Sequence, residues 1–164
     1  MKKITYLIIS LIFLNFINAC VGYKPIYTTT NLQFEIADYS IKTNKKLGSQ
    51  IYSKLYNLSK SNKKNAETKS ITIIIDTIKN KAATAKDSAG KVLEYRIILN
   101  SNIIIKDYLT DDKILNQSFS YSSVYKVQDN HSETIKIENK SIENLINKMY
   151  QDLLIKMSDK ILTK

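Results

Sequence analysis

The chain has 164 residues, a length typical of one globular domain. With 43% hydrophobic and 24% charged residues, its composition excludes a wholly disordered or fibrous protein. Lysine and arginine number 25 against 15 aspartate and glutamate, and the net charge of +10 favours an anionic partner such as nucleic acid, phospholipid or lipopolysaccharide.

Residues 1–19 have the pattern of an export signal. Lys2 and Lys3 precede an apolar run from Leu7 to Leu14 that only Ser10 interrupts. The run is too short for a membrane-spanning helix, which needs about 20 mostly apolar residues. We therefore expect residues 1–19 to be a cleaved signal peptide.

Residues 17–20, Ile-Asn-Ala-Cys, resemble the bacterial lipoprotein signal, in which an aliphatic and a small residue at fixed places direct lipidation of the cysteine that follows. The resemblance implies that Cys20, the only cysteine, becomes the lipidated first residue of the mature chain. Two or more acyl chains suffice for stable anchoring, because each buried methylene contributes about 0.8 kcal/mol. The alternative is a thiol in an uncleaved anchor or an unpaired buried cysteine. Because Val21 and not aspartate follows, the resemblance implies the periplasmic face of the outer membrane.

After a lipidated tether at residues 20–31, residues 32–164 are predicted to form one domain. Leu32, Phe34 and Ile36 alternate with other residues, which predicts a strand that ends near Ile41. Helical spacing of apolar residues then predicts an amphipathic helix over residues 45–61. Its expected buried stripe is Leu47, Ile51, Leu55 and Leu58. The lysine-rich segment 62–69 is predicted to be a solvated connection.

A second strand and a long hairpin loop are predicted next. Isoleucine at every other position from Ile71 to Ile75 predicts the strand. Hydrophobicity disappears from Lys79 to Lys91, and residues 87–90, Asp-Ser-Ala-Gly, have turn chemistry. We therefore predict that residues 79–91 form a hairpin loop.

Two further strands are predicted from a period of two. Apolar residues from Leu93 to Ile105 share one parity that only Ser101 breaks, and a similar pattern runs from Leu115 to Tyr125. A hairpin at residues 107–113 joins the two strands. The opposite parity of these strands offers polar residues to water or to a partner: Glu94, Arg96, Asn100, Asn102, Asn116, Ser118, Ser120 and Ser122.

A closing helix is predicted to start between Glu133 and Ser141, without a strong capping box. Its apolar stripe is Ile142, Leu145, Ile146, Met149, Leu153, Met157 and Ile161, with Lys140, Lys148 and Lys156 on the opposite side. The element order β-α-β-β-β-α predicts an α+β fold. We expect a two-layer sandwich in which a mainly antiparallel four-stranded sheet carries both helices on one face.

No catalytic or metal-binding pattern is found. The chain has no G-x-S-x-G, H-E-x-x-H or glycine-rich phosphate loop, and one cysteine and one histidine cannot form a Cys/His zinc site. His131 is predicted to lie solvated in a polar loop, and Asp111 and Asp112 to lie in a turn. We therefore expect no enzyme activity, no metal and no cofactor.

The spread of the basic residues argues against a nucleic-acid partner. In proteins that bind nucleic acid, lysine and arginine usually cluster with aromatic residues on one element. Lysines are dispersed, Arg96 is the only arginine, and an exported protein does not meet nucleic acid. A polyanionic lipid is the better partner. The lysines of the predicted loop could bind the phosphates of a glycolipid: Lys79, Lys81, Lys86 and Lys91. The alternative is a solvated lysine-rich face.

Residues 20–27, Cys-Val-Gly-Tyr-Lys-Pro-Ile-Tyr, resemble the C-G-[FY]-x-P-[LI]-Y opening of the lipopolysaccharide-assembly lipoprotein family LptE, with Val21 as an added residue. Residues 70–105 and the closing amphipathic helix also resemble that family. The resemblance implies a lipoprotein that plugs the lumen of the outer-membrane β-barrel LptD, assists its assembly and contacts lipopolysaccharide. The predicted polar sheet face suits the polar interior of such a barrel.

The same resemblance suggests lipopolysaccharide-binding residues. Ser88 occupies a position that is basic in the family, so we expect the contact to move to Lys86 or Lys91, and Lys136 lies near a second basic position of the family. The prediction is an LptE-like outer-membrane lipoprotein. Alternatives are an auxiliary lipoprotein of a phospholipid or solute ABC transport system and a periplasmic hydrolase with a diffuse site near His131.

Overall fold

A computed structural model describes residues 32–61 and 68–161, whose fold is the predicted order of strands and helices. The elements are β1 (Phe34–Ile41), α2 (Lys45–Ser61), β2 (Lys69–Lys86), β3 (Val92–Asp107), β4 (Lys113–Lys126) and α3 (His131–Ile161). The predicted α+β class is confirmed, and α2 has the predicted bounds. The signal peptide, Cys20 with its tether at residues 20–31, and most of the 62–69 connection lie outside the described residues.

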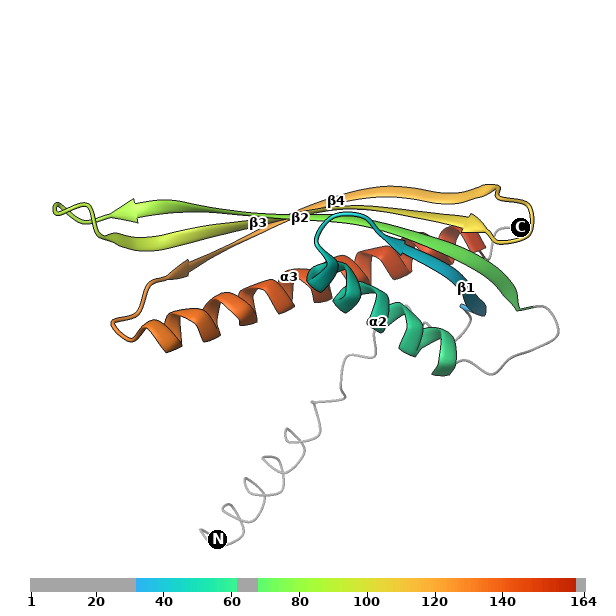
Figure 1. The fold of residues 1–164 in the computed structure, drawn as a ribbon, viewed down its shortest axis with the longest axis horizontal. Helices are drawn as coiled ribbons and strands as arrows, with labels where there is room; N and C mark the ends of the chain where they lie inside the picture. Colours follow the sequence, from blue (N-terminus) through green and yellow to red (C-terminus); the bar gives the residue numbers. More distant parts are fainter. Residues whose placement is uncertain (1–31, 62–67, 162–164) are drawn as a thin grey trace, which may run out of the picture.

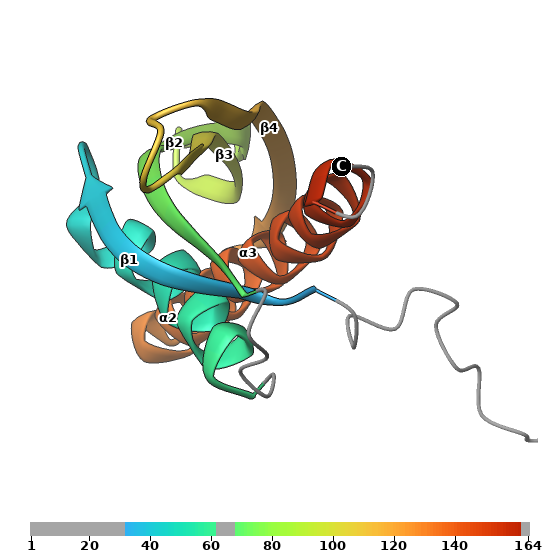
Figure 2. The same cartoon turned by 90° about the vertical axis from the view of Figure 1, so that its right-hand side faces the viewer.

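The four strands form one sheet in the order β1-β2-β3-β4. β1 pairs parallel to β2, whereas β2, β3 and β4 pair antiparallel. The parallel pair requires a crossover connection, and α2 lies in it. Both helices pack on the same face of the sheet, α2 beneath β1 and β2 and the longer α3 along β4 (Figures 1 and 2). The structure is therefore the predicted two-layer sandwich.

The core lies between this sheet face and the helices. Its largest fully buried side chains come from alternate strand positions and from both helices: Leu32, Phe34, Ile51, Leu55, Ile71, Ile73, Ile75, Ile97, Leu99, Ile103, Ile105 and Ile146. The predicted stripe of the closing helix is buried except for Ile161, which packs at its edge. At the break in the β3 pattern, the buried Ser101 hydroxyl lies 2.8 Å from the hydroxyl of Thr77 on β2. The two polar groups therefore satisfy each other inside the core.

The predicted hairpin loop at residues 79–91 was wrong, because β2 continues to Lys86. Lys79 pairs with Leu99 and Lys86 with Val92, so only residues 87–91 form the turn. The side chains from Lys81 to Thr84 are exposed, so this part of the strand has no buried face and no alternation of polarity. It is a strand because its backbone pairs with β3, and that partner cannot be recognised from the local pattern.

The start of α3 also differs from the prediction. The helix begins at His131, which is exposed in its first turn and does not lie in a loop. Asn130 precedes it as the N-cap, since its side-chain oxygen accepts a hydrogen bond of 2.9 Å from the backbone N–H of Ser132. Asn130 and Glu133 have the spacing of a capping box, and this spacing marks the start of α3 in the sequence. In the described part of the chain, no helix is long and apolar enough to span a membrane.

Candidate functional site

The outer face of the sheet is the first candidate surface. Within the described residues 32–61 and 68–161, no helix or strand covers this face, because both helices lie on the opposite face (Figure 1). Asn100 accepts a hydrogen bond of 2.7 Å from Ser120, and Asn102 accepts one of 3.2 Å from Ser118. These cross-strand pairs confirm that the polar parity of β3 and β4 faces away from the core.

Apolar side chains also lie on this outer face, although the sequence pattern did not predict an apolar patch there. Ile78 on β2 is 47% exposed and Val124 on β4 is 44% exposed. Next to Ile78, a shallow hollow of about 300 Å³ is lined by the paired asparagines and serines. The face therefore offers hydrogen-bonding groups and apolar patches together, a combination that suits a protein partner with a polar surface.

The hairpin tip carries two of the three predicted lipopolysaccharide-binding residues. Lys86 and Lys91 are both exposed and flank the same turn. The side chain of Asp87 fixes the turn by accepting hydrogen bonds of 2.9 and 2.8 Å from the backbone N–H groups of Ala89 and Lys91. Gly90 adopts a φ of 82°, which favours glycine. The tip thus presents two lysines on a defined turn that projects beyond the helices (Figure 1).

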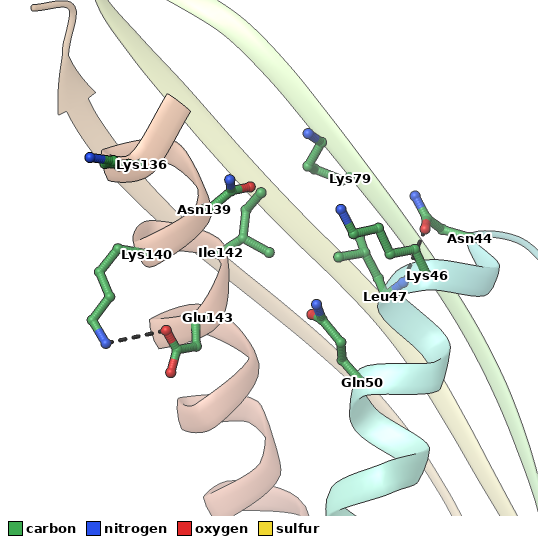
Figure 3. A pocket seen from close by; sticks show the side chains of 10 residues that line it. All are labelled: Asn44, Lys46, Leu47, Gln50, Lys79, Lys136, Asn139, Lys140, Ile142 and Glu143. Carbon is green, nitrogen blue, oxygen red and sulfur yellow. Dashed lines mark hydrogen bonds and ion pairs between the residues drawn. The ribbon is translucent and has the colours of Figure 1, made fainter. Parts of the chain in front are cut away.

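The third predicted residue, Lys136, lies elsewhere. It is exposed on α3 and lines a hollow of about 570 Å³ between α2, α3 and β2, which neither Lys86 nor Lys91 lines (Figure 3). The structure therefore divides the predicted basic residues between two places, the hairpin tip and this hollow.

Lys79 and Lys81, predicted to lie in the loop, are strand residues that bind Glu138 of α3. Their ammonium groups lie 3.0 and 2.6 Å from the two carboxylate oxygens, and Tyr125 donates a hydrogen bond of 2.7 Å to the same carboxylate. Lys81 also lies 4.1 Å from the ring centroid of Tyr95. This cluster connects β2, β4 and α3 where the hairpin begins to project.

Charge and burial set the protonation of this cluster. Partial burial raises the pKa of Glu138, but hydrogen bonds from Lys81, Tyr125 and Lys79 lower it more, and the pKa falls from 4.5 to about 2. The Glu138 carboxylate is therefore charged throughout the physiological range, and its role is to hold the three elements together. No sequence pattern predicts this contact, because it depends on the register of α3 against the sheet.

A second link between α3 and the sheet joins Tyr121 and Asp152, whose side chains are hydrogen-bonded. Burial and this hydrogen bond raise the pKa of Tyr121 to about 12, so its phenol stays protonated and remains a donor. Among the described residues, no group of three histidine, cysteine, aspartate or glutamate side chains could hold a metal ion.

Comparison with known proteins identifies the fold. The sequence matches no family model, and no curated protein is detectably similar to it. The solved structure of the uncharacterized lipoprotein B from Nitrosomonas europaea superposes with a TM-score of 0.56 at 16% identity, covering 87% of this chain and 93% of that chain. A minor lipoprotein from Acinetobacter baumannii superposes with a TM-score of 0.51 at 13% identity, covering 77% of this chain and 93% of the other.

This fold is one that bacterial lipoproteins adopt. A Caulobacter crescentus structure also superposes, with a TM-score of 0.54 at 9% identity over 78% of this chain and 90% of the other. At such identities the likeness concerns the architecture, not the residues at any site. Lipidation of Cys20 and the LptE resemblance remain predictions from the sequence.

Proposed function

We propose that this protein is a lipid-anchored envelope lipoprotein of the LptE type, which acts without catalysis as the structural partner of an outer-membrane β-barrel that inserts lipopolysaccharide. One observation carries the proposal: a chain whose only cysteine ends a lipoprotein-like signal folds as bacterial lipoproteins do. Fold likeness and signal are independent of each other, and together they support an envelope lipoprotein. The resemblance of residues 20–27 to the LptE opening favours the LptE type over an auxiliary lipoprotein of an ABC transport system.

The outer face of the sheet supports a role inside a barrel lumen. Barrel interiors are polar, so a domain lodged there must hydrogen-bond along its surface. The serines and asparagines of β3 and β4 form short cross-strand pairs and still have unused hydrogen-bonding capacity for a partner. Ile78 and Val124 add apolar contact area between them. We propose that this face docks against the barrel wall.

The hairpin tip supports a contact with lipopolysaccharide. Lys86 and Lys91 are exposed on a fixed turn, and lysine ammonium groups form charge-assisted hydrogen bonds to phosphate. Substituting both residues as Lys86→Glu with Lys91→Glu should weaken lipopolysaccharide binding by the purified protein. A matched pair, Lys113→Glu with Lys156→Glu, makes the same charge change at exposed positions away from the tip. If both double variants bound lipopolysaccharide with the same affinity, Lys86 and Lys91 would be solvated surface residues and not specific ligands.

Lipidation is tested by the variant Cys20→Ala. Wild-type protein extracted from membranes should have a mature mass increased by acyl chains, and the variant should appear in the soluble or mislocalised fraction. An unlipidated wild-type mass together with unchanged membrane fractionation of Cys20→Ala would contradict the proposed anchor.

A further inference from the structure

The hollow between α2, α3 and β2 is lined by lysines from all three elements. Its lining includes Lys46 from α2, Lys79 from β2, and Lys136 and Lys140 from α3. Glu143 is the only acidic residue that lines it in the described part of the chain, and its carboxylate lies 3.2 Å from Lys140. Lys79 shares the carboxylate of Glu138 with Lys81, so that single negative charge is divided between two lysines. Positive charge in the hollow therefore exceeds what its neighbours neutralise.

The start of α2 adds to this excess. Asn44 caps the helix, since its side-chain oxygen accepts a hydrogen bond of 3.1 Å from the backbone N–H of Leu47. Lys45 and Lys46 follow in a first turn that contains no acidic residue. The positive end of the helix dipole disfavours cations there, so this arrangement goes against the local preference. Such local conflicts are expected at functional sites, where a ligand supplies what the chain lacks.

Neutral donors complete the hollow. In Figure 3, Lys46 and Gln50 extend from α2 toward α3, Asn139 and Ile142 face them, and Lys79 lies above. Lys136 and Lys140 extend from the side of α3 away from α2 and form the rim (Figure 3). Among residues 32–61 and 68–161, no carboxylate pairs with Lys46, and the side chains of Gln50 and Asn139 make no hydrogen bond. Buried Leu47 and Ile142 supply the apolar floor.

We propose that this hollow binds a phosphate group, with Lys46 and Lys79 as its cationic ligands and the amides of Gln50 and Asn139 as neutral donors. Lysine carries three donors, so Lys79 keeps two when one is directed to Glu138. The volume of about 570 Å³ exceeds that of a phosphate ion and lies within the range of small-molecule sites. The phosphate belongs to a soluble molecule or to a lipid headgroup. This site is additional to the hairpin tip and does not depend on the barrel proposal.

The test uses the full-length protein in non-ionic detergent micelles, titrated separately with inorganic phosphate and with short-chain phosphatidic acid. The side-chain amide NMR signals of Gln50 and Asn139 are expected to shift and saturate. Short-chain phosphatidylcholine, which has no net charge, is the control ligand. If inorganic phosphate saturates the shifts, the site also accepts soluble phosphates. If only phosphatidic acid saturates them, the site is specific for a lipid headgroup. Saturation with neither probe would overturn the proposal.

Two neighbouring lysines provide matched variants. Lys46→Gln removes a ligand of the hollow, whereas Lys45→Gln removes the same charge from the same exposed helix turn without touching the lining. We expect Lys46→Gln to weaken binding about tenfold, the value of one charge-assisted hydrogen bond, and Lys45→Gln to weaken it less than about twofold. An equal loss of affinity in both variants would mean that the positive charge of the helix start attracts phosphate without a defined site, and it would overturn the assigned site. This titration measures neither lipopolysaccharide binding nor barrel association, so failure of the phosphate site and failure of the proposed function can be told apart.

Discussion

Replacing Glu138 tests whether the charged cluster stabilises the projecting hairpin. Glu138→Gln keeps the shape of the side chain but removes the charge that Lys79 and Lys81 share. In the native state the pKa of this carboxyl is about 2 instead of 4.5. At 1.36 kcal/mol per pH unit, this difference corresponds to about 3 kcal/mol of the free energy of unfolding.

Solvent reduces this value. The Glu138 side chain is 16% exposed and its partners Lys79 and Lys81 are 28% and 33% exposed, so water screens part of the interaction. We therefore expect Glu138→Gln to lower the free energy of unfolding by about 1–2 kcal/mol at pH 7. Glu143→Gln is the matched control. Its pair with Lys140 is formed by side chains that are 57% and 66% exposed, and its loss should cost less than about 0.5 kcal/mol.

The pH dependence has a definite sign. Because the pKa of Glu138 is lower in the folded protein, the unfolded chain binds more protons between pH 4.5 and pH 2. The stabilisation is therefore complete above pH 4.5 and is lost as the pH falls toward 2. Urea unfolding of the wild type and both variants between pH 7 and pH 3 measures it. The reasoning would be refuted if Glu138→Gln matched the wild type at pH 7, or if the difference did not shrink on acidification.

Two further substitutions test the packing, with urea unfolding as the measurement. Gly48→Ala should destabilise the protein by about 1–3 kcal/mol, because the added Cβ would collide with Ile41. Alanine is the better helix former, so without this collision the variant would be more stable. An increase in stability would therefore contradict the close approach of α2 to β1. Ser101→Ala should cost about 1–2 kcal/mol, because it leaves the buried Thr77 hydroxyl without its partner. The double variant Thr77→Val with Ser101→Ala should recover part of that loss, and strict additivity would argue against the pair.

The sequence predicted those parts of the fold in which one face of an element is buried. The isoleucines of β2, the alternating core residues of β3 and the stripe of α3 all appear as simple periods, because burial imposes polarity at fixed spacing. The outer half of β2 could not be predicted in this way. From Lys81 to Thr84 its side chains are exposed, and only backbone pairing with β3 makes it a strand. That pairing depends on a partner that lies later in the chain.

The candidate sites were predictable only in part. Lys86 and Lys91 flank a turn that Gly90 marks in the sequence, so their common position could be expected. The hollow combines residues of α2, β2 and α3, and no spacing along the chain indicates that Lys46 and Lys79 line the same space. One signal was available: two lysines directly after the N-cap Asn44, where acidic residues are preferred.

The most direct test of the proposed function is to identify what accompanies the protein from membranes. The tagged full-length chain would be purified after mild detergent solubilisation, and the complex analysed by native mass spectrometry. We predict an equimolar complex with one large outer-membrane β-barrel, and a Cys20 that carries acyl chains. A permease complex in its place, or an unacylated protein without any barrel, would contradict the account.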